Sequence, residues 1–123
     1  MKLSIVIPAH NEQKNISRCL DELHQVVWEQ NLIPHEIIVV NDNSSDDTES
    51  VVRRYMQRHD QVRLVNRPAP GGFGRAIRTG LDAVTGDVVV ICMADLSDSP
   101  EDVVACYRKI CEGYDCVFGS RFI

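Results

Sequence analysis

The stretch Asp87-Val-Val-Val-Ile-Cys92 is a continuous apolar run rich in β-branched residues, and Met93-Ala-Asp-Leu-Ser-Asp-Ser-Pro100 follows it directly. The run predicts a strand that is buried on both faces and central in a sheet. It ends at two carboxylates, Asp95 and Asp98, which are costly beside a buried strand unless a cation meets them. A divalent metal that holds a phosphate is one interpretation, and a plain turn before a helix is the other. This segment alone leaves both open.

A helix is expected to begin at the end of this stretch. Ser99 is typical of an N-cap, Pro100 of the first helical position, and Asp102 has the spacing of a capping box with Ser99. The apolar spacing that follows predicts a helix over residues 101–112, with Gly113 at its end.

The same order of apolar strand, polar turn and amphipathic helix recurs along the chain. Further strands are expected over residues 2–8, 36–40, 62–65 and 115–118. Further helices are expected over residues 12–30, from a capping box of Asp46 and Glu49 through Met56, and after Arg75, where Ala76, Ile77, Leu81 and Val84 face inward and Gly86 caps the end.

This alternation predicts an α/β fold with a doubly wound, mostly parallel sheet of about five strands and helices on both faces. The 123 residues suffice for one compact domain, residues 1–123. Ligands of such sheets bind outside the carboxyl ends of the strands. In this chain, polar clusters follow every predicted strand, so we expect a binding cleft along that edge.

Several residues at this edge suit a phosphorylated ligand. Gly71-Gly-Phe-Gly74 precedes a helix and lets backbone N–H groups approach an anion, while Arg75 and Arg78 lie one helical turn apart. Asp42 could accept a hydrogen bond from a nucleobase, although the position by itself favours a turn aspartate. Asn11 and Glu12 fit either a ligand site or a first helical turn.

The composition excludes other classes. A net charge of −5 argues against a nucleic-acid binder, and no apolar run approaches the roughly 20 residues of a membrane span. The start of the chain lacks the pattern of a signal peptide. The odd count of five cysteines, without a C-x-x-C pair, predicts free thiols in a reducing cytoplasm rather than disulfides or a zinc site. Neither a G-x-G-x-x-G after the first strand nor a P-loop occurs.

Six motifs occur together in the order known from one family. They are Val6-Ile-Pro-Ala-His-Asn-Glu12, Ile38-Val-Val-Asn-Asp-Asn-Ser-Ser-Asp-Asp-Thr48, Gly71-Gly-Phe-Gly-Arg-Ala-Ile-Arg-Thr-Gly80, Thr85-Gly-Asp87, Ala94-Asp-Leu-Ser-Asp-Ser-Pro100 and Gly119-Ser-Arg121. The chain resembles the family-two glycosyltransferases of the GT-A fold, most of all the dolichyl-phosphate mannosyltransferase and polyprenyl-phosphate sugar transferase branch.

The resemblance implies an inverting transfer from a UDP- or GDP-sugar, with Mg²⁺ or Mn²⁺, and a polyprenyl-phosphate acceptor at the membrane surface. By position in the motifs, the donor-binding residues would be Pro8, Ala9, Asn11, Glu12, Asp42, Gly71, Gly72, Arg75, Arg78, Ala94 and Asp95. Asp95 would also be the metal carboxylate, with Asp98 as a substitute second ligand. Arg121 would lie near a phosphate of the donor or acceptor and join Asp95 in catalysis.

The chain departs from the family pattern in two ways. The usual D-x-D motif reads Met93-Ala94-Asp95, so its first aspartate is missing. The resembled enzymes also continue beyond Gly-Ser-Arg, so the chain is expected to be the nucleotide-binding half of a longer enzyme. Two alternatives therefore stay open: a non-catalytic nucleotide-sugar-binding module, and a structural domain whose polar edge consists only of turns.

Overall fold

Four parallel strands form one sheet in the order β3-β2-β1-β4 in the computed structural model, which describes residues 1–96 and 99–113. The strands are β1 (Leu3–Ala9), β2 (His35–Asp42), β3 (Val62–Arg67) and β4 (Val88–Ile91). The helices are α1 (Ile16–Leu23), the π-helix η1 (His24–Gln30), α2 (Thr48–Met56), α3 (Phe73–Ala83) and α4 (Pro100–Cys111).

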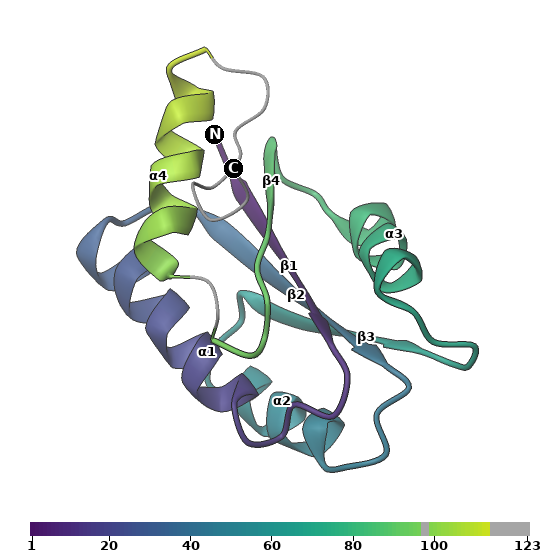
Figure 1. The fold of residues 1–123 in the computed structure, drawn as a ribbon. Helices are drawn as coiled ribbons and strands as arrows, with labels where there is room; N and C mark the ends of the chain where they lie inside the picture. The colour runs from purple at the N-terminus through teal and green to yellow at the C-terminus, as the bar shows by residue number, and fades with distance from the viewer. Residues whose placement is uncertain (97–98, 114–123) are drawn as a thin grey trace.

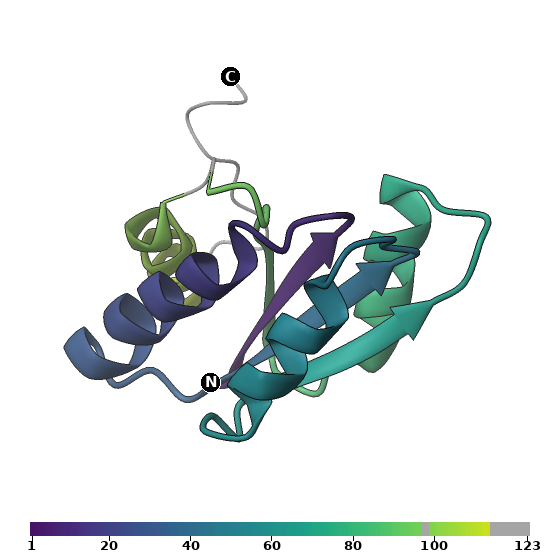
Figure 2. The ribbon, with the colours of Figure 1, turned by 90° about the horizontal axis from the view of Figure 1, so that it is seen from below.

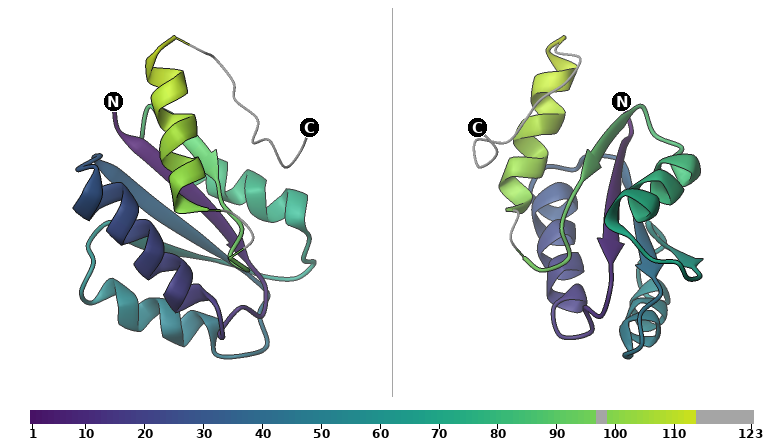
Figure 3. Two further views of the ribbon diagram at one scale, coloured as in Figure 1. Left: turned by 60° about the vertical axis from the view of Figure 1, so that its left-hand side comes forward. Right: turned by 45° about the vertical axis from the view of Figure 1, so that its right-hand side comes forward.

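Helices cover both faces of the sheet (Figures 1 and 2). Helices α1, α2 and α4, together with η1, pack on one face against a large apolar cluster that includes Ile5, Ile37 and Leu20. Helix α3 packs on the other face, where Val6, Ile38, Val40 and Ala76 form a smaller cluster. The right-hand view of Figure 3 shows α3 and α4 on opposite sides of the sheet. The predicted doubly wound α/β architecture is confirmed.

Strand β4 differs from its prediction. It pairs only with β1 among the described strands, so β1 and β2 are central and β4 lies at one end of the described sheet. Val88 is buried, but Val89 and Val90 are half-buried and Ile91 is 39% exposed. The expectation of a strand buried on both faces is therefore wrong at Ile91, while its expected central position stays a prediction. The expected strand over 115–118 lies outside the described residues.

Three local expectations are also corrected. The first helix begins at Ile16 rather than Glu12, and it continues as η1. Asp46 does not form a capping box with Glu49; its carboxylate instead accepts hydrogen bonds from the backbone and side chain of Thr48. Helix α3 ends at Ala83, before Gly86, and Leu81 is 44% exposed rather than inward.

The predicted start of the last helix is confirmed. Ser99 caps α4 by accepting hydrogen bonds from the N–H groups of Glu101 and Asp102, and Pro100 is the first helical residue. Val103, Val104 and Tyr107 form its buried side.

Among the described residues, no helix has the length and apolar character needed to cross a membrane. Cys19 and Cys92 are buried, as their apolar positions predicted.

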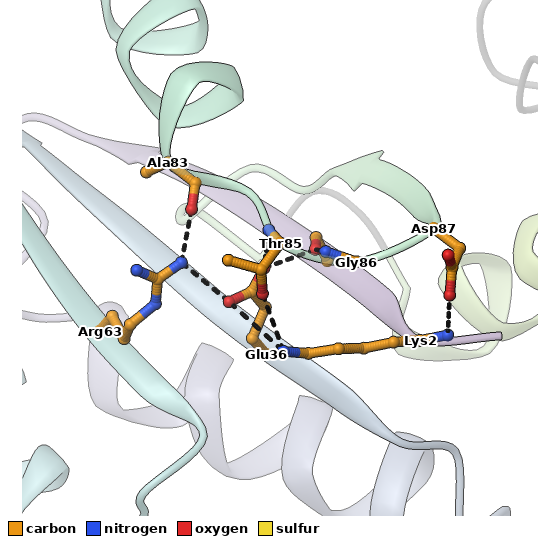
Figure 4. Close-up of polar contacts among 8 residues, drawn as sticks. Lys2, Glu36, Arg63, Ala83, Thr85, Gly86 and Asp87 are labelled. Atoms are coloured by element: carbon orange, nitrogen blue, oxygen red, sulfur yellow. Dashed lines mark hydrogen bonds and ion pairs between the residues drawn. The ribbon is translucent and has the colours of Figure 1, made fainter.

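The amino end of the sheet is tied together by the buried carboxylate of Glu36 (Figure 4). Glu36 accepts hydrogen bonds from Ser4 Oγ at 2.6 Å, from the Thr85 N–H at 2.6 Å and from Arg63 Nη2 at 2.8 Å. Gly86 completes the group by donating its N–H to Ser4 Oγ. These bonds join β1, β2 and β3 to the connection between α3 and β4, far from the carboxyl ends of the strands.

Candidate functional site

A cavity of about 330 Å³ opens at the carboxyl ends of β1 and β2, beside the start of α3. Its lining consists of Pro8, Ala9, His10, Glu12, Asp42, Gly71, Gly72, Phe73, Ala76 and Met93. Residues from four separate stretches of sequence therefore meet in one place. This is the edge at which parallel α/β sheets bind ligands.

Asp42 is the charged centre of this cavity. It is the last residue of β2 and only 6% exposed, so its carboxylate needs partners within the protein. Oδ2 accepts a hydrogen bond from the Gly72 N–H at 2.8 Å, and Oδ1 lies 3.3 Å from Arg67 Nη1. An ionised carboxylate has about four lone-pair sites, so two protein donors leave acceptor capacity for a ligand.

The glycine pair forms one wall of the cavity. Gly72 has φ +154°, a conformation that residues with a side chain rarely adopt, and it is the N-cap of α3. A Cβ at Gly71 would make van der Waals contact with Asp42 Oδ2 at 3.4 Å, so glycine leaves this side of the carboxylate uncovered. The loop thus brings backbone N–H groups and the positive end of the α3 dipole to the cavity.

The segment after β1 is held by the loop that follows β2. His10 Nδ1 donates to the backbone oxygen of Asp42 at 2.8 Å. Asn11 has φ +54°; its N–H donates to Ser44 Oγ, and its Oδ1 accepts from the Ser45 N–H at 2.8 Å. Asn11 therefore joins the two loops rather than lining the cavity. Glu12 lines it, with its N–H bonded to Thr48 Oγ1.

Six of the eleven expected donor-binding residues line the cavity: Pro8, Ala9, Glu12, Asp42, Gly71 and Gly72. Arg75 and Arg78 lie on α3 and are exposed, outside the lining. Ala94 is buried and Asp95 is exposed, both beyond the end of β4, while Met93 reaches the cavity. Asp98 and Arg121 lie outside the described residues.

The sequence did not indicate four of the ten lining residues: His10, Phe73, Ala76 and Met93. The first three stand inside motifs singled out above, and Met93 stands where the family has the first aspartate of D-x-D. The sequence also did not indicate Arg67, which contacts Asp42. The signal for Arg67 is its place at the end of β3, shortly before the glycine loop. Phe73 is 55% exposed and gives the cavity an aromatic side.

The side chains at this edge can be compared with the ligands that a divalent metal ion requires. The described residues contain no group of three or more His, Cys, Asp or Glu side chains placed to hold an ion. Mg²⁺ in phosphate sites is usually bound by one or two carboxylates together with the phosphates of the substrate. The exposed carboxylate of Asp95 fits that kind of site, whereas the thioether of Met93 is a poor ligand for a hard cation.

Comparison with known proteins gives the chain its family. Residues 4–123 match the model of glycosyl transferase family 2. The chain is 30% identical over its whole length to a dolichol-phosphate mannosyltransferase of Pyrococcus furiosus, of which it covers 34%. The chain spans only 33–38% of the length of three such curated relatives, which are therefore about three times longer.

Two solved structures have the same fold. One is the mannosyltransferase PcManGT of Pyrobaculum calidifontis in complex with GDP-Man and Mn²⁺, with a TM-score of 0.77 and 27% identity over 97% of this chain and 36% of that one. The other is the glucosyl-3-phosphoglycerate synthase of Mycobacterium tuberculosis in complex with UDP, with a TM-score of 0.72 and 28% identity over 91% of this chain and 40% of that one. The chain belongs to glycosyl transferase family 2, with the GT-A fold of these enzymes.

Proposed function

We propose that residues 1–123 are the donor-binding domain of an inverting glycosyltransferase that uses a UDP- or GDP-sugar. The observation that carries this proposal is the cavity that combines the buried Asp42 carboxylate with the glycine loop at the start of α3. One group suits a nucleobase and the other suits a diphosphate. Structural neighbours in complex with GDP-Man and with UDP support the same class of ligand.

Asp42 would recognise the base by accepting a hydrogen bond from its ring N–H. A carboxylate offers only acceptors, so it matches a base edge that presents donors. Uracil presents its N3–H, and guanine presents its N1–H and N2–H groups. Cytosine and adenine place an unprotonated ring nitrogen at the equivalent position, which would face the carboxylate without a hydrogen. The proposal therefore favours UDP and GDP over CDP and ADP.

The diphosphate would lie toward the first turn of α3. The N–H groups of this turn and the helix dipole favour an anion there. Arg75 and Arg78 are exposed one turn apart on the same helix and can supply positive charge as the sugar–phosphate bond breaks. Asp95 is the described carboxylate that would hold Mg²⁺ or Mn²⁺, with Asp98 as the second. The metal would neutralise the diphosphate leaving group.

The acceptor in this proposal is a polyprenyl phosphate at a membrane surface, on the cytoplasmic side. The dolichol-phosphate mannosyltransferase relative supports this choice. A phosphomonoester has a second pKa of about 6, so its oxygen is already anionic at neutral pH and needs no general base. Arg121 would meet the phosphate of the donor or acceptor.

Titration calorimetry with UDP-, GDP- and CDP-sugars, with and without Mn²⁺, tests the proposal. We expect binding of a UDP- or GDP-sugar and no binding of CDP-sugars at the same concentrations. If no nucleotide bound, the proposal would fail, and the alternative of a structural domain whose polar edge consists only of turns would remain. Met93, where the resembled enzymes have aspartate, favours one second candidate, a non-catalytic binding module. Sugar transfer by a longer version of the protein would separate the enzyme from that module.

A further inference from the structure

We infer that Arg67 is a positioning residue that orients the Asp42 carboxylate and fixes the loop Pro68–Gly72 as a wall of the cavity. The inference rests on the proposed function for the identity of the ligand. The arrangement itself is a property of the protein alone, and it can be measured without nucleotide.

Strand register places Arg67 beside Asp42. The two residues are partners in the parallel pairing of β2 and β3, and each is the last residue of its strand. Their side chains are 17% and 9% exposed. The Asn43 N–H also donates to the Arg67 backbone oxygen at 3.1 Å, which continues the pairing just beyond the strands. The ion pair therefore joins two residues whose backbones are fixed by strand pairing, rather than residues of two loops.

The guanidinium and the carboxylate hold the loop at different points. Arg67 Nη1 lies 3.3 Å from Asp42 Oδ1 and 3.3 Å from the Pro68 oxygen, and it also donates to the Pro70 oxygen. Asp42 Oδ2 accepts the Gly72 N–H at 2.8 Å. Arg67 thus restrains the beginning and middle of the loop, while Asp42 restrains its end. Gly71 and Gly72, which line the cavity, are placed by this pair.

The pair also fixes the rotation of the carboxylate. With one donor at each oxygen, the carboxylate plane is held by contacts on two sides, and the remaining lone pairs keep one direction. Arginine suits this role because its planar guanidinium presents several donors in a fixed geometry, whereas lysine is a flexible point charge. A base would then meet a carboxylate that is already oriented, which lowers the entropic cost of binding.

The same two strands provide a matched control. Arg63 of β3 donates to the buried carboxylate of Glu36 of β2, at the opposite end of the sheet (Figure 4). Arg63→Met and Arg67→Met therefore remove the same kind of ion pair, and only the second is at the cavity. Arg67→Lys serves as a milder variant, since it keeps the positive charge and changes only the geometry.

The first measurement is amide hydrogen exchange of Gly72 without nucleotide. We expect the exchange rate of the Gly72 amide to rise about tenfold in Arg67→Met and to rise in Arg67→Lys as well. In both variants the Asp42 carboxylate that accepts the Gly72 N–H is no longer held in place. Arg63→Met should leave this exchange rate unchanged. Unchanged Gly72 exchange in both Arg67 variants would overturn the inference. A comparable rise in Arg63→Met would also overturn it, because the effect would then be general destabilisation.

The second measurement is a double-mutant cycle on UDP and GDP affinity. Arg67→Met should weaken binding about tenfold in the wild-type background and less than twofold in an Asp42→Asn background, because it acts through Asp42. If the affinity losses of Arg67→Met and Asp42→Asn were additive, the inference would be overturned. Nucleotide binding by the wild type would still support the proposed function in that case. If the wild type bound neither nucleotide, the proposed function would fail, and Gly72 exchange would still decide the positioning role.

Discussion

The Glu36 carboxylate and the Arg63 guanidinium meet at 2.8 Å on adjacent strands, with Glu36 only 5% exposed. Burial by itself raises the pKa of Glu36, but hydrogen bonds from Ser4 and Thr85, together with the charge of Arg63, outweigh it and lower the pKa to about 2. The charged form is thus strongly favoured in the folded protein. An unpartnered carboxylate at this depth would be costly, so these contacts determine how the amino end of the sheet is held.

This arrangement predicts a specific dependence of stability on acid. The folded pKa of Glu36, about 2, lies below its ordinary value of 4.5, so the unfolded state binds the proton more readily between these values. The contribution of Glu36 is fully present above pH 4.5 and is lost as the pH falls toward 2. It amounts to at most about 3 kcal/mol. Urea denaturation followed by circular dichroism at each pH measures it.

The variant Glu36→Gln provides the comparison for that experiment. It keeps the shape of the side chain and removes its titration, so stability at pH 7 should fall while the slope between pH 4.5 and 2 becomes shallower. A slope equal to that of the wild type would assign the acid sensitivity to other carboxylates.

Gly80 allows helix α3 to approach the sheet closely, which gives a second prediction. A Cβ at Gly80 would overlap Val6 Cγ1 and lie 3.2 Å from Val40 Cγ2, both in the buried core. Gly80→Ala should therefore destabilise the protein by about 1–3 kcal/mol despite the better helix propensity of alanine. The control is Gly74→Ala in the same helix, where no atom lies within 4 Å of the added Cβ. Thermal unfolding should show a loss only for Gly80→Ala.

Strand–helix alternation was enough to predict the architecture and the edge at which the cavity lies. Apolar runs and their polar ends place Glu12, Asp42 and Gly71 at one edge, because all parallel strands end there. Pro8 and Ala9 were expected at the cavity only from the family resemblance. The prediction was wrong where packing rather than pattern decides. Leu81 has helical spacing with Ala76 and Ile77, but α3 contacts the sheet through Ala76 and Gly80, which leaves Leu81 exposed.

Contacts between distant loops were beyond the reach of the sequence. The pairing of Arg67 with Asp42 depends on the register of β2 and β3, which a hydrophobic pattern does not determine. Asn11 was expected at the ligand from its place in a family motif, and in the structure its side-chain oxygen accepts a hydrogen bond from the Ser45 N–H in the loop after β2. Arg67 ends β3 and Asn11 follows β1, and both are polar, so only their partners distinguish support of the loops from contact with the cavity.

Asp42 is the residue whose loss should affect nucleotide binding most directly, if it accepts the base N–H as proposed. Asp42→Ala should weaken UDP or GDP binding by about 1–3 kcal/mol, because the ligand donor loses its acceptor. Asp42→Asn keeps the shape and introduces donors, so it should also reduce the preference over CDP. Calorimetry on variants with native circular dichroism measures both effects. Unchanged affinity in a folded Asp42→Ala protein would remove Asp42 from the site.

Asp95 leads to the last prediction, which concerns metal binding. It is exposed just beyond β4, two residues after Met93, which lines the cavity and offers no oxygen ligand. A diphosphate placed near this carboxylate would be repelled unless a divalent cation lay between them. We therefore expect weak Mn²⁺ binding by the protein alone and much tighter binding with UDP or GDP, because the phosphates supply further ligands. Electron paramagnetic resonance of free Mn²⁺ measures this affinity directly.

The variant Asp95→Asn should abolish the increase in Mn²⁺ affinity caused by nucleotide. The control is Asp82→Asn at an exposed position on α3, which should preserve that increase. Tight Mn²⁺ binding without nucleotide, or nucleotide binding indifferent to both Mn²⁺ and Asp95→Asn, would exclude Asp95 as the metal ligand.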